Sequence, residues 1–256
     1  NVSHGCPEIA MVASWRRNFY ILLAAELFAI IGFQAVQPFL PYYIQEFEVA
    51  DLAEALLWAG YMGTAGGIAM AISSPIWGTL ADRFGRKSMV VRSMLGGGVT
   101  VVFMAYASTV EQLLVARTLQ GMLAGTVTAC LTLISTTTPK QHLGFALGLM
   151  QGTFMLGASL GPLLGGPFIE QFGYFDCFLV SGAMVLLAGL AVQLWVREDF
   201  HPENQVREED GSRETFFHGA ARLLRKRALV VVLVSMTLVQ FAFGVIMPVV
   251  PLFLQE

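Results

Sequence analysis

The sequence has few charged residues and few cysteines. Only 13% of its 256 residues are Asp, Glu, Lys or Arg, about half of the roughly 25% that soluble domains carry. The three cysteines, Cys6, Cys130 and Cys177, are odd in number and far apart, which predicts neither a disulfide framework nor a metal site. The net charge of −3 excludes a broadly basic nucleic-acid binder. The 55% hydrophobic content excludes a disordered chain and indicates a membrane protein.

Recognisable catalytic and cofactor-binding patterns are missing as well. The four histidines lie in arms and loops without the spacing of metal ligands. No glycine-rich phosphate loop leads into a Lys followed by Ser or Thr. We therefore expect neither an enzyme nor an ATP-driven pump, and no metal or cofactor.

Long apolar runs fill most of the chain, and each approaches the roughly 20 residues that a membrane-spanning helix needs. We identify seven runs, at residues 19–40, 56–77, 89–107, 112–134, 143–168, 175–196 and 228–253. Strands of a membrane barrel would be about ten residues long and of alternating polarity, so these runs predict an all-α integral membrane protein. Between the sixth and seventh runs lies a polar stretch that we interpret as a solvated linker.

Basic residues define the orientation, since loops rich in Lys and Arg stay in the cytoplasm. Of the 15 basic residues, we assign all but Arg117 to the N-terminal arm, the even-numbered loops and the linker; Arg92 is placed in the second loop. The odd-numbered loops contain acidic residues and neither Lys nor Arg. This partition predicts a multi-pass protein with a cytoplasmic N-terminus.

An internal repeat relates the first run to the seventh. Residues 33–46 and 243–256 share a Phe, two prolines, a Gln and a Glu at matching positions, and both segments follow a pair of basic residues. The seventh run is thus interpreted as the first helix of a second six-helix half, which makes the chain a fragment. We divide it into an arm (1–14, in part non-native because Met11 is a candidate start), a six-helix bundle (15–196), a cytoplasmic linker (197–227) and the first helix of a truncated second bundle (228–256).

The loop after the second run reads GTLADRFGRK at residues 78–87. This resembles the G-x-L-a-D-r-x-G-r-r/k signature of the major facilitator superfamily. Gly78 allows close helix approach, Gly85 permits a tight turn and the basic residues retain the loop in the cytoplasm. The resemblance implies that this latch loop fastens the two halves in the outward-open state. The implied latch residues are Gly78, Asp82, Arg83, Gly85, Arg86 and Lys87.

Arg117 is the basic residue in the interior of a run, in the segment Arg-Thr-Leu-Gln-Gly at 117–121. An ionisable group there costs at least about 2.5–3.5 kcal/mol on insertion scales, so we expect it to face the bundle or a cavity. Gln120 lies one turn away and can share its partner. The segment is similar to the family's R-x-x-q-G motif, which implies a role in proton coupling; an arginine reaching the membrane rim is the alternative.

The fifth run has two glycine trios at a spacing of four residues, which form flat faces for helix packing. Its second half resembles the family's antiporter motif, ending G-P-x-x-G-G, and this implies an exporter whose helix packs against one from the other half. Pro162 is expected to bend the helix. The motif residues are Gly152, Gly157, Gly161, Pro162, Gly165 and Gly166.

Glu26 is the acidic residue in the interior of a run. Desolvation disfavours a charged carboxylate, so this group can load and release a proton, or meet a cationic substrate. Gln34 lies about two turns further on and is expected on roughly the same face. We predict a substrate cavity lined by Glu26, Gln34, Gln37 and Gln120, with proton coupling by Glu26 and Arg117. The alternative is a glutamate at the cytoplasmic boundary that reaches water.

Together these motifs are similar to a bacterial drug/proton antiporter, a multidrug-resistance efflux protein of the inner or plasma membrane. The resemblance implies alternating access, a small-molecule substrate, protons and lipid as partners, no nucleic acid, and a monomer when complete. One alternative is an importer or facilitator of a sugar or metabolite, which would need more polar groups in its cavity. Another is a transport-incompetent fragment with only an assembly role.

Overall fold

The computed structural model describes residues 7–47, 51–198, 230–232 and 234–239, with side chains from Trp15 onward. The chain divides into two units, Asn1–Phe200 and His201–Glu256, and the first is the subject below. Most of the expected seventh run, the second copy of the repeat at 243–256 and the linker at 199–227 lie outside the described residues. Within the run, the described residues 230–232 and 234–239 are helical.

The described residues of the first unit form helices and contain no strand, which confirms the helical fold class. The elements are α1 (Pro7–Val36), η1 (Gln37–Phe39), α2 (Leu40–Gln45), α3 (Leu52–Phe84), α4 (Arg86–Ala105), α5 (Val110–Leu123), α6 (Thr126–Thr137) and α7 (Lys140–Trp195). Among the described residues, five helical spans are long and apolar enough to cross a membrane. The 56 residues of α7 are more than twice what one crossing needs. Since its backbone leaves the helical region at Gly173 (φ 85°, ψ 173°), α7 covers both the fifth and the sixth run.

Side-chain caps explain where two of the helices begin. The Asp51 carboxylate accepts a hydrogen bond of 2.8 Å from the Glu54 N–H and caps α3. Thr109 caps α5 in the same way through the Gln112 N–H at 3.3 Å. These caps fix the ends of two long apolar helices whose first N–H groups would otherwise be unsatisfied.

The fourth run is broken into α5 and α6, although the sequence predicts one helix there. Gly125 adopts φ 112°, a left-handed conformation that few residues other than glycine accept, and α6 starts immediately after it. The break lies between the half of the run that contains Arg117 and the half that contains Cys130.

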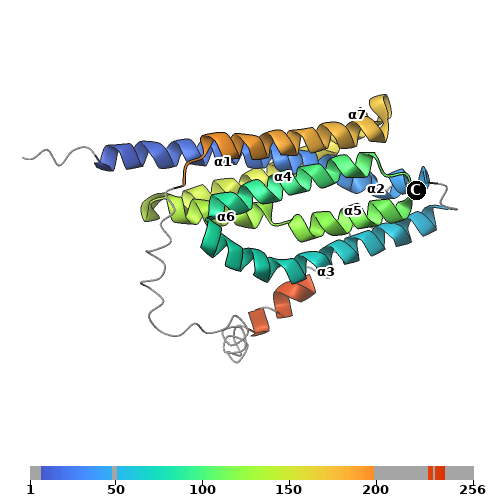
Figure 1. Cartoon of the computed structure of the whole chain (residues 1–256), viewed down its shortest axis with the longest axis horizontal. Helices are drawn as coiled ribbons and strands as arrows, with labels where there is room; N and C mark the ends of the chain where they lie inside the picture. Colours follow the sequence, from blue (N-terminus) through green and yellow to red (C-terminus); the bar gives the residue numbers. More distant parts are fainter. Residues whose placement is uncertain (1–6, 48–50, 199–229, 233, 240–256) are drawn as a thin grey trace, which may run out of the picture. The chain divides into compact units, whose positions relative to one another are not determined.

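Two hydrophobic cores lie along the bundle. Figure 1 shows α1 beside α7 and α3 beside α5, in agreement with the contacts between these elements. One core joins α1, α4, α6 and α7 around Leu22, Met94 and Leu133. The other joins the C-terminal end of α1 with α2, α3, α4, α5 and α7 around Tyr43, Met62 and Phe178. Helices α1, α4 and α7 contribute to both cores, and Phe33 of α1 packs against both.

Candidate functional site

Arg117 on α5 contacts two of the glutamines that the sequence assigned to the cavity. Its guanidinium donates to the side-chain carbonyl of Gln120, one turn along the same helix, and to that of Gln37 at the start of η1. No described carboxylate pairs with Arg117, and a guanidinium remains protonated under ordinary conditions. We call Arg117, Gln120 and Gln37 the arginine site. It is a half-buried positive charge held by neutral amides.

The glycine of the R-x-x-q-G segment has a packing role. A Cβ on Gly121 would lie 2.7 Å from both the Cα and the carbonyl carbon of Gly66, so α5 and α3 touch backbone to backbone there. The carbonyl of Arg117 lies 3.4 Å from the position of a Cβ on Gly66. The crossing of α3 and α5 is therefore fixed at the level of the arginine site.

Glu26 has a different environment. The side chain is 0% exposed, and neither carboxylate oxygen has a well-formed hydrogen bond within the described part of the chain. The thiol of Cys130 on α6 lies beside it. Leu22 and Ala29, one turn before and one turn after on the same face of α1, are fully buried. We call Glu26 and Cys130 the carboxylate site; in it Glu26 does not reach water, contrary to the boundary alternative.

Gln34 does not share the surroundings of Glu26. A Cβ on Gly161 of α7 would lie 2.6 Å from the Gln34 Cβ, so Gln34 lies against α7. Glu26 instead lies beside Cys130 on α6. The expectation of one common face is corrected in this respect, because the two turns between the residues rotate them toward different helices. The structure thus brings Gln37, Gln120 and Arg117 together and leaves Glu26 apart from them.

The antiporter-motif glycines pack against α1 of the same bundle. A Cβ on Gly157 would meet Ile30 at 2.9 Å, and one on Gly165 would overlap the backbone of Ala35. This confirms close packing at a spacing of four residues. Gly157, Gly161 and Gly165 face α1, so the packing of this helix against the other half stays a prediction for its remaining faces. Gly166 approaches Phe39, and α7 stays helical through Pro162.

The first glycine trio of α7 lies on open surface within the described unit. A Cβ on Gly144, Gly148 or Gly152 would meet no described atom within 4 Å. Gly152 therefore belongs to a different face from the rest of its motif. Gly78 is equally open, so the close approach expected there does not occur between helices of this bundle.

The latch loop makes its turn at Gly85, as the sequence predicts. Gly85 has φ 86° and ends α3 directly before α4 begins. Asp82 and Arg83 are exposed at the end of α3, and neither side chain has a polar contact among the described residues. The backbone N–H groups of Arg86 and Lys87 donate to the carboxylate of Glu198, beyond the end of α7.

Arg92 was assigned to the second loop, and that assignment is wrong. It lies inside α4, since the helix starts at Arg86 directly after the turn. Its guanidinium carbon is 3.7 Å from the ring centroid of Trp77, an attractive cation–π geometry. The guanidinium also donates to the carbonyl of Ala124 at 3.4 Å, and the Trp77 indole N–H donates to the carbonyl of Met122 at 2.7 Å.

This Trp77–Arg92 pair satisfies carbonyls at the break between α5 and α6, where the helical ladder cannot. The pair is not among the contacts predicted from the sequence. Arg92 itself could have predicted this contact. It lies six residues after the start of an apolar helix, and a cation there needs a partner on a neighbouring helix.

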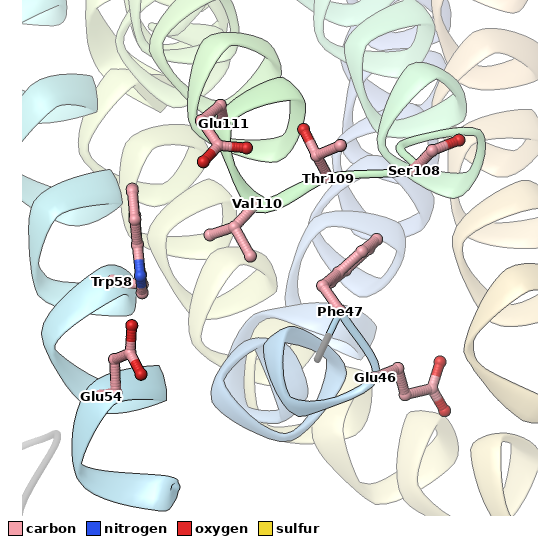
Figure 2. A pocket seen from close by; sticks show the side chains of 8 residues that line it. All are labelled: Glu46, Phe47, Glu54, Trp58, Ser108, Thr109, Val110 and Glu111. Carbon is pink, nitrogen blue, oxygen red and sulfur yellow. The ribbon is translucent and has the colours of Figure 1, made fainter. Parts of the chain in front are cut away.

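A pocket opens at the end of the bundle opposite the latch loop, in the region of the odd-numbered loops. Figure 2 shows it between the start of α3, the end of α2 and the segment before α5. Its volume is about 560 Å³. Three glutamates line it together with two aromatic rings and small residues: Glu46, Glu54, Glu111, Phe47, Trp58, Ser108, Thr109 and Val110. The arrangement is acidic and open, and it lies apart from both the arginine site and the carboxylate site.

Comparisons with known proteins agree with this arrangement. The family profile described as Major Facilitator Superfamily matches residues 22–256. The chain is 31% identical over 243 residues to the multidrug resistance protein MdtG of Proteus mirabilis, covering 95% of this chain and 59% of the relative. It is 33% identical to MdtG of Escherichia fergusonii, covering 95% of this chain and 58% of the relative. The chain thus spans less than two thirds of the length of these relatives.

A solved structure supports the fold. The human organic anion transporter MFSD10 (TETRAN) superposes with a TM-score of 0.63 at 17% sequence identity, covering 74% of this chain and 49% of that one. At this identity the likeness concerns the fold alone, a helical transporter bundle.

Proposed function

Because this chain belongs to the Major Facilitator Superfamily and is thus a multi-pass membrane transporter, we propose that it exports small hydrophobic compounds, drugs among them, in exchange for protons. The two six-helix halves of such a transporter would rock around a central cavity and expose it to one side at a time. Protonation would favour one state and substrate the other.

The observation that carries the proposal is the surroundings of Glu26. A carboxylate without a well-formed hydrogen bond in an apolar core is strongly disfavoured in its charged form. The neighbouring thiol of Cys130 is a weak donor and adds little to that balance. Glu26 would hold a proton while the core is closed around it and release it when the bundle admits water.

Arg117 supplies a fixed charge in this scheme. Its two amide partners orient the guanidinium without neutralising it, so its field would favour loss of a proton from a nearby acid and disfavour entry of cations. Gln37 connects the charge to the end of α1, the helix that also contains Glu26. A movement of α1 would therefore change both environments together.

Export and drug substrates are supported by the relatives, which are named multidrug resistance proteins, and by the resemblance of residues 152–166 to the antiporter motif. Their bacterial origin supports a place in the bacterial cell membrane. The importer alternative gains no support from the described interior, whose polar side chains are few.

The orientation can be tested by labelling. Ser88, at the latch-loop end, and Ser108, at the pocket end, are both exposed. With a cytoplasmic N-terminus, Ser108→Cys in intact cells should react with a membrane-impermeant maleimide, whereas Ser88→Cys should react only after the cells are opened. The reverse pattern would overturn the orientation.

The proton role can be tested in a full-length transporter that contains this sequence, reconstituted in proteoliposomes. Glu26→Gln keeps the size of the side chain and removes the titrating group. We expect the variant to lose transport driven by a pH gradient and to retain exchange of a labelled substrate without a gradient. Glu170→Gln, which changes an exposed acid on α7, is the matched control and should behave like the parent.

Two probes separate proton coupling from recognition of cations. If Glu26 couples protons, both tetraphenylphosphonium and a neutral hydrophobic dye should lose gradient-driven transport in Glu26→Gln. If Glu26 only neutralises cationic substrates, the neutral dye should still be pumped. Gradient-driven transport of both probes at the parent's rate would remove Glu26 from the mechanism.

A further inference from the structure

The chain leaving α7 is fastened to α1. The side-chain amide of Asn18 is 5% exposed and pairs with the backbone of Arg197 in both directions. The Asn18 Nδ2 donates to the Arg197 carbonyl at 2.6 Å, and the Arg197 N–H donates to the Asn18 Oδ1 at 3.2 Å. This fixes the backbone of Arg197 although the sequence alone suggests that it begins a solvated linker.

The next residue reaches the latch loop. The two carboxylate oxygens of Glu198 accept hydrogen bonds from the N–H groups of Arg86 at 3.0 Å and Lys87 at 2.8 Å. These N–H groups belong to the first turn of α4, which has no side-chain cap of its own because Gly85 precedes it. A carboxylate there satisfies two orphan donors and complements the positive end of the helix dipole.

The side chain of Lys87 adds a second contact, from the start of α4 to the end of α7. Its ammonium donates to the carbonyl of Gln193 at 2.7 Å, in the last turn of α7, where carbonyls lack helical partners. The start of α4 and the end of α7 thus cap each other with opposite charges. We call this set the linker clasp: Asn18, Arg86, Lys87, Gln193, Arg197 and Glu198.

We propose that Glu198 is a positioning residue for the latch loop, which it ties to the first residues of the linker so that loop and linker start move as one unit. The proposal rests on the latch role that the family resemblance implies for Arg86. It adds that the conformation of the Gly85–Lys87 turn is set from the end of α7 through Glu198. A change in the path of the linker would therefore reach the latch directly.

A first experiment measures the clasp without transport. Hydrogen–deuterium exchange is followed for the peptide covering residues 84–91 in the full-length transporter, held in lipid nanodiscs. Glu198→Gln places an amide NH₂ where one oxygen accepts from α4, so a donor would face a donor. We expect exchange of the Arg86 and Lys87 amides to quicken about tenfold, which corresponds to roughly 1.4 kcal/mol. Glu170→Gln should leave it unchanged.

A second experiment asks whether the clasp serves the latch. In the same transporter, Glu198→Gln should lower kcat for tetraphenylphosphonium efflux several-fold, with KM and the thermal unfolding midpoint close to the parent's values. Glu198→Asp, which keeps the charge, should recover part of the loss. A purely structural role would instead lower the unfolding midpoint and quicken exchange throughout the bundle.

The outcomes separate this inference from the latch proposal. Unchanged exchange at residues 84–91 in Glu198→Gln would overturn the clasp whatever happens to transport. Quicker exchange together with normal efflux in both Glu198→Gln and Arg86→Ala would remove the latch role and, with it, Glu198 as a positioning residue. If Glu198→Gln does not fold, Asn18→Ala frees Arg197 and is expected to quicken the same amides.

Discussion

Helix α1 and η1, which follows it directly, contribute to two polar regions with opposite surroundings. At Glu26 the bundle closes an apolar core around a carboxylate, with the thiol of Cys130 beside it. At Gln37, three turns further on, an amide meets the guanidinium of Arg117 in a half-open region. The first group can lose its charge by taking up a proton, whereas the second cannot readily lose its own.

This difference supports the division of roles proposed above for Glu26 and Arg117. A buried acid whose neighbouring donor is only a thiol responds when its surroundings open to water, so it suits a switch. A guanidinium with two amide acceptors keeps both its charge and its position, so it suits a fixed field. Substitutions at Arg117, Gly121, Glu26 and Trp77 can break or sharpen this contrast, from the largest expected effect to the smallest.

Arg117→Ala should have the largest effect. It removes the fixed charge and two charge-assisted hydrogen bonds, each worth about 1.5–3 kcal/mol, and leaves two amides without a donor. We expect gradient-driven efflux to fall about 100-fold or more, since each 1.36 kcal/mol corresponds to a factor of ten. The measurement is dye efflux from proteoliposomes.

Arg117→Lys tests whether a positive charge alone is sufficient at this position. An ammonium keeps the charge but cannot reproduce the planar fork that reaches two acceptors. It should recover only part of the activity, while Val115→Ala, an exposed change on the same helix, should be close to the parent. Full activity in Arg117→Ala would show that no fixed charge is needed there.

Gly121→Ala tests the backbone contact that holds the arginine site. The added methyl would overlap the backbone of Gly66, and overpacking of this kind costs about 1–3 kcal/mol. Gly63→Ala on α3 is the matched control, because a Cβ there meets no described atom. A lower thermal unfolding midpoint is expected for Gly121→Ala alone; equal midpoints would mean that α3 and α5 are not fixed at this crossing.

Glu26→Met should stabilise the bundle while stopping proton coupling. An unsatisfied polar group in an apolar site costs about 1–3 kcal/mol by mutational data, and a methionine fills similar space. Arg117→Met should have the opposite sign, because it leaves the amides of Gln37 and Gln120 unpaired. Unfolding in detergent measures both variants, and a midpoint for Glu26→Met below the parent's would show that Glu26 has a stabilising partner.

Trp77→Phe should have the smallest effect. It keeps an aromatic ring under Arg92 and loses the hydrogen bond to Met122, worth about 1 kcal/mol. Because the break lies between the two regions, we expect slightly faster hydrogen exchange at residues 122–130 and a modest loss of efflux. Exchange at the parent's rate would indicate that Arg92 alone holds the break.

Much of the fold could be predicted because hydropathy and basic residues report on the membrane itself. Apolar length located the five long apolar spans of the described residues, the last of which covers two of the expected runs, and Gly85 identified a turn that needs positive φ. The break at Gly125 could not be foreseen, since glycine is common in membrane helices and only some such residues leave the helical region.

The sequence predicted which residues form the candidate sites, but only some of the contacts between them. Arg117 and Gln120 share a helix, so their contact follows from their spacing. That Gln37 joins them, and that Glu26 stands apart, depends on how α1 is rotated against α6 and α7. That rotation is set by the glycine stripe at Gly157–Gly165 and by the packing of both cores, which no single helix reveals.

The packing of α1 on that glycine stripe also affects how the protein is made. Glu26 enters the membrane well before Gly165 is synthesised, and at roughly 5–20 residues per second α1 waits on the order of ten seconds for its partner. During that interval its acidic side chain faces lipid or the insertion machinery without the apolar core that later surrounds it. We therefore expect a variant with a second charge in α1 to be degraded or misinserted during biogenesis, before any defect in transport could be measured.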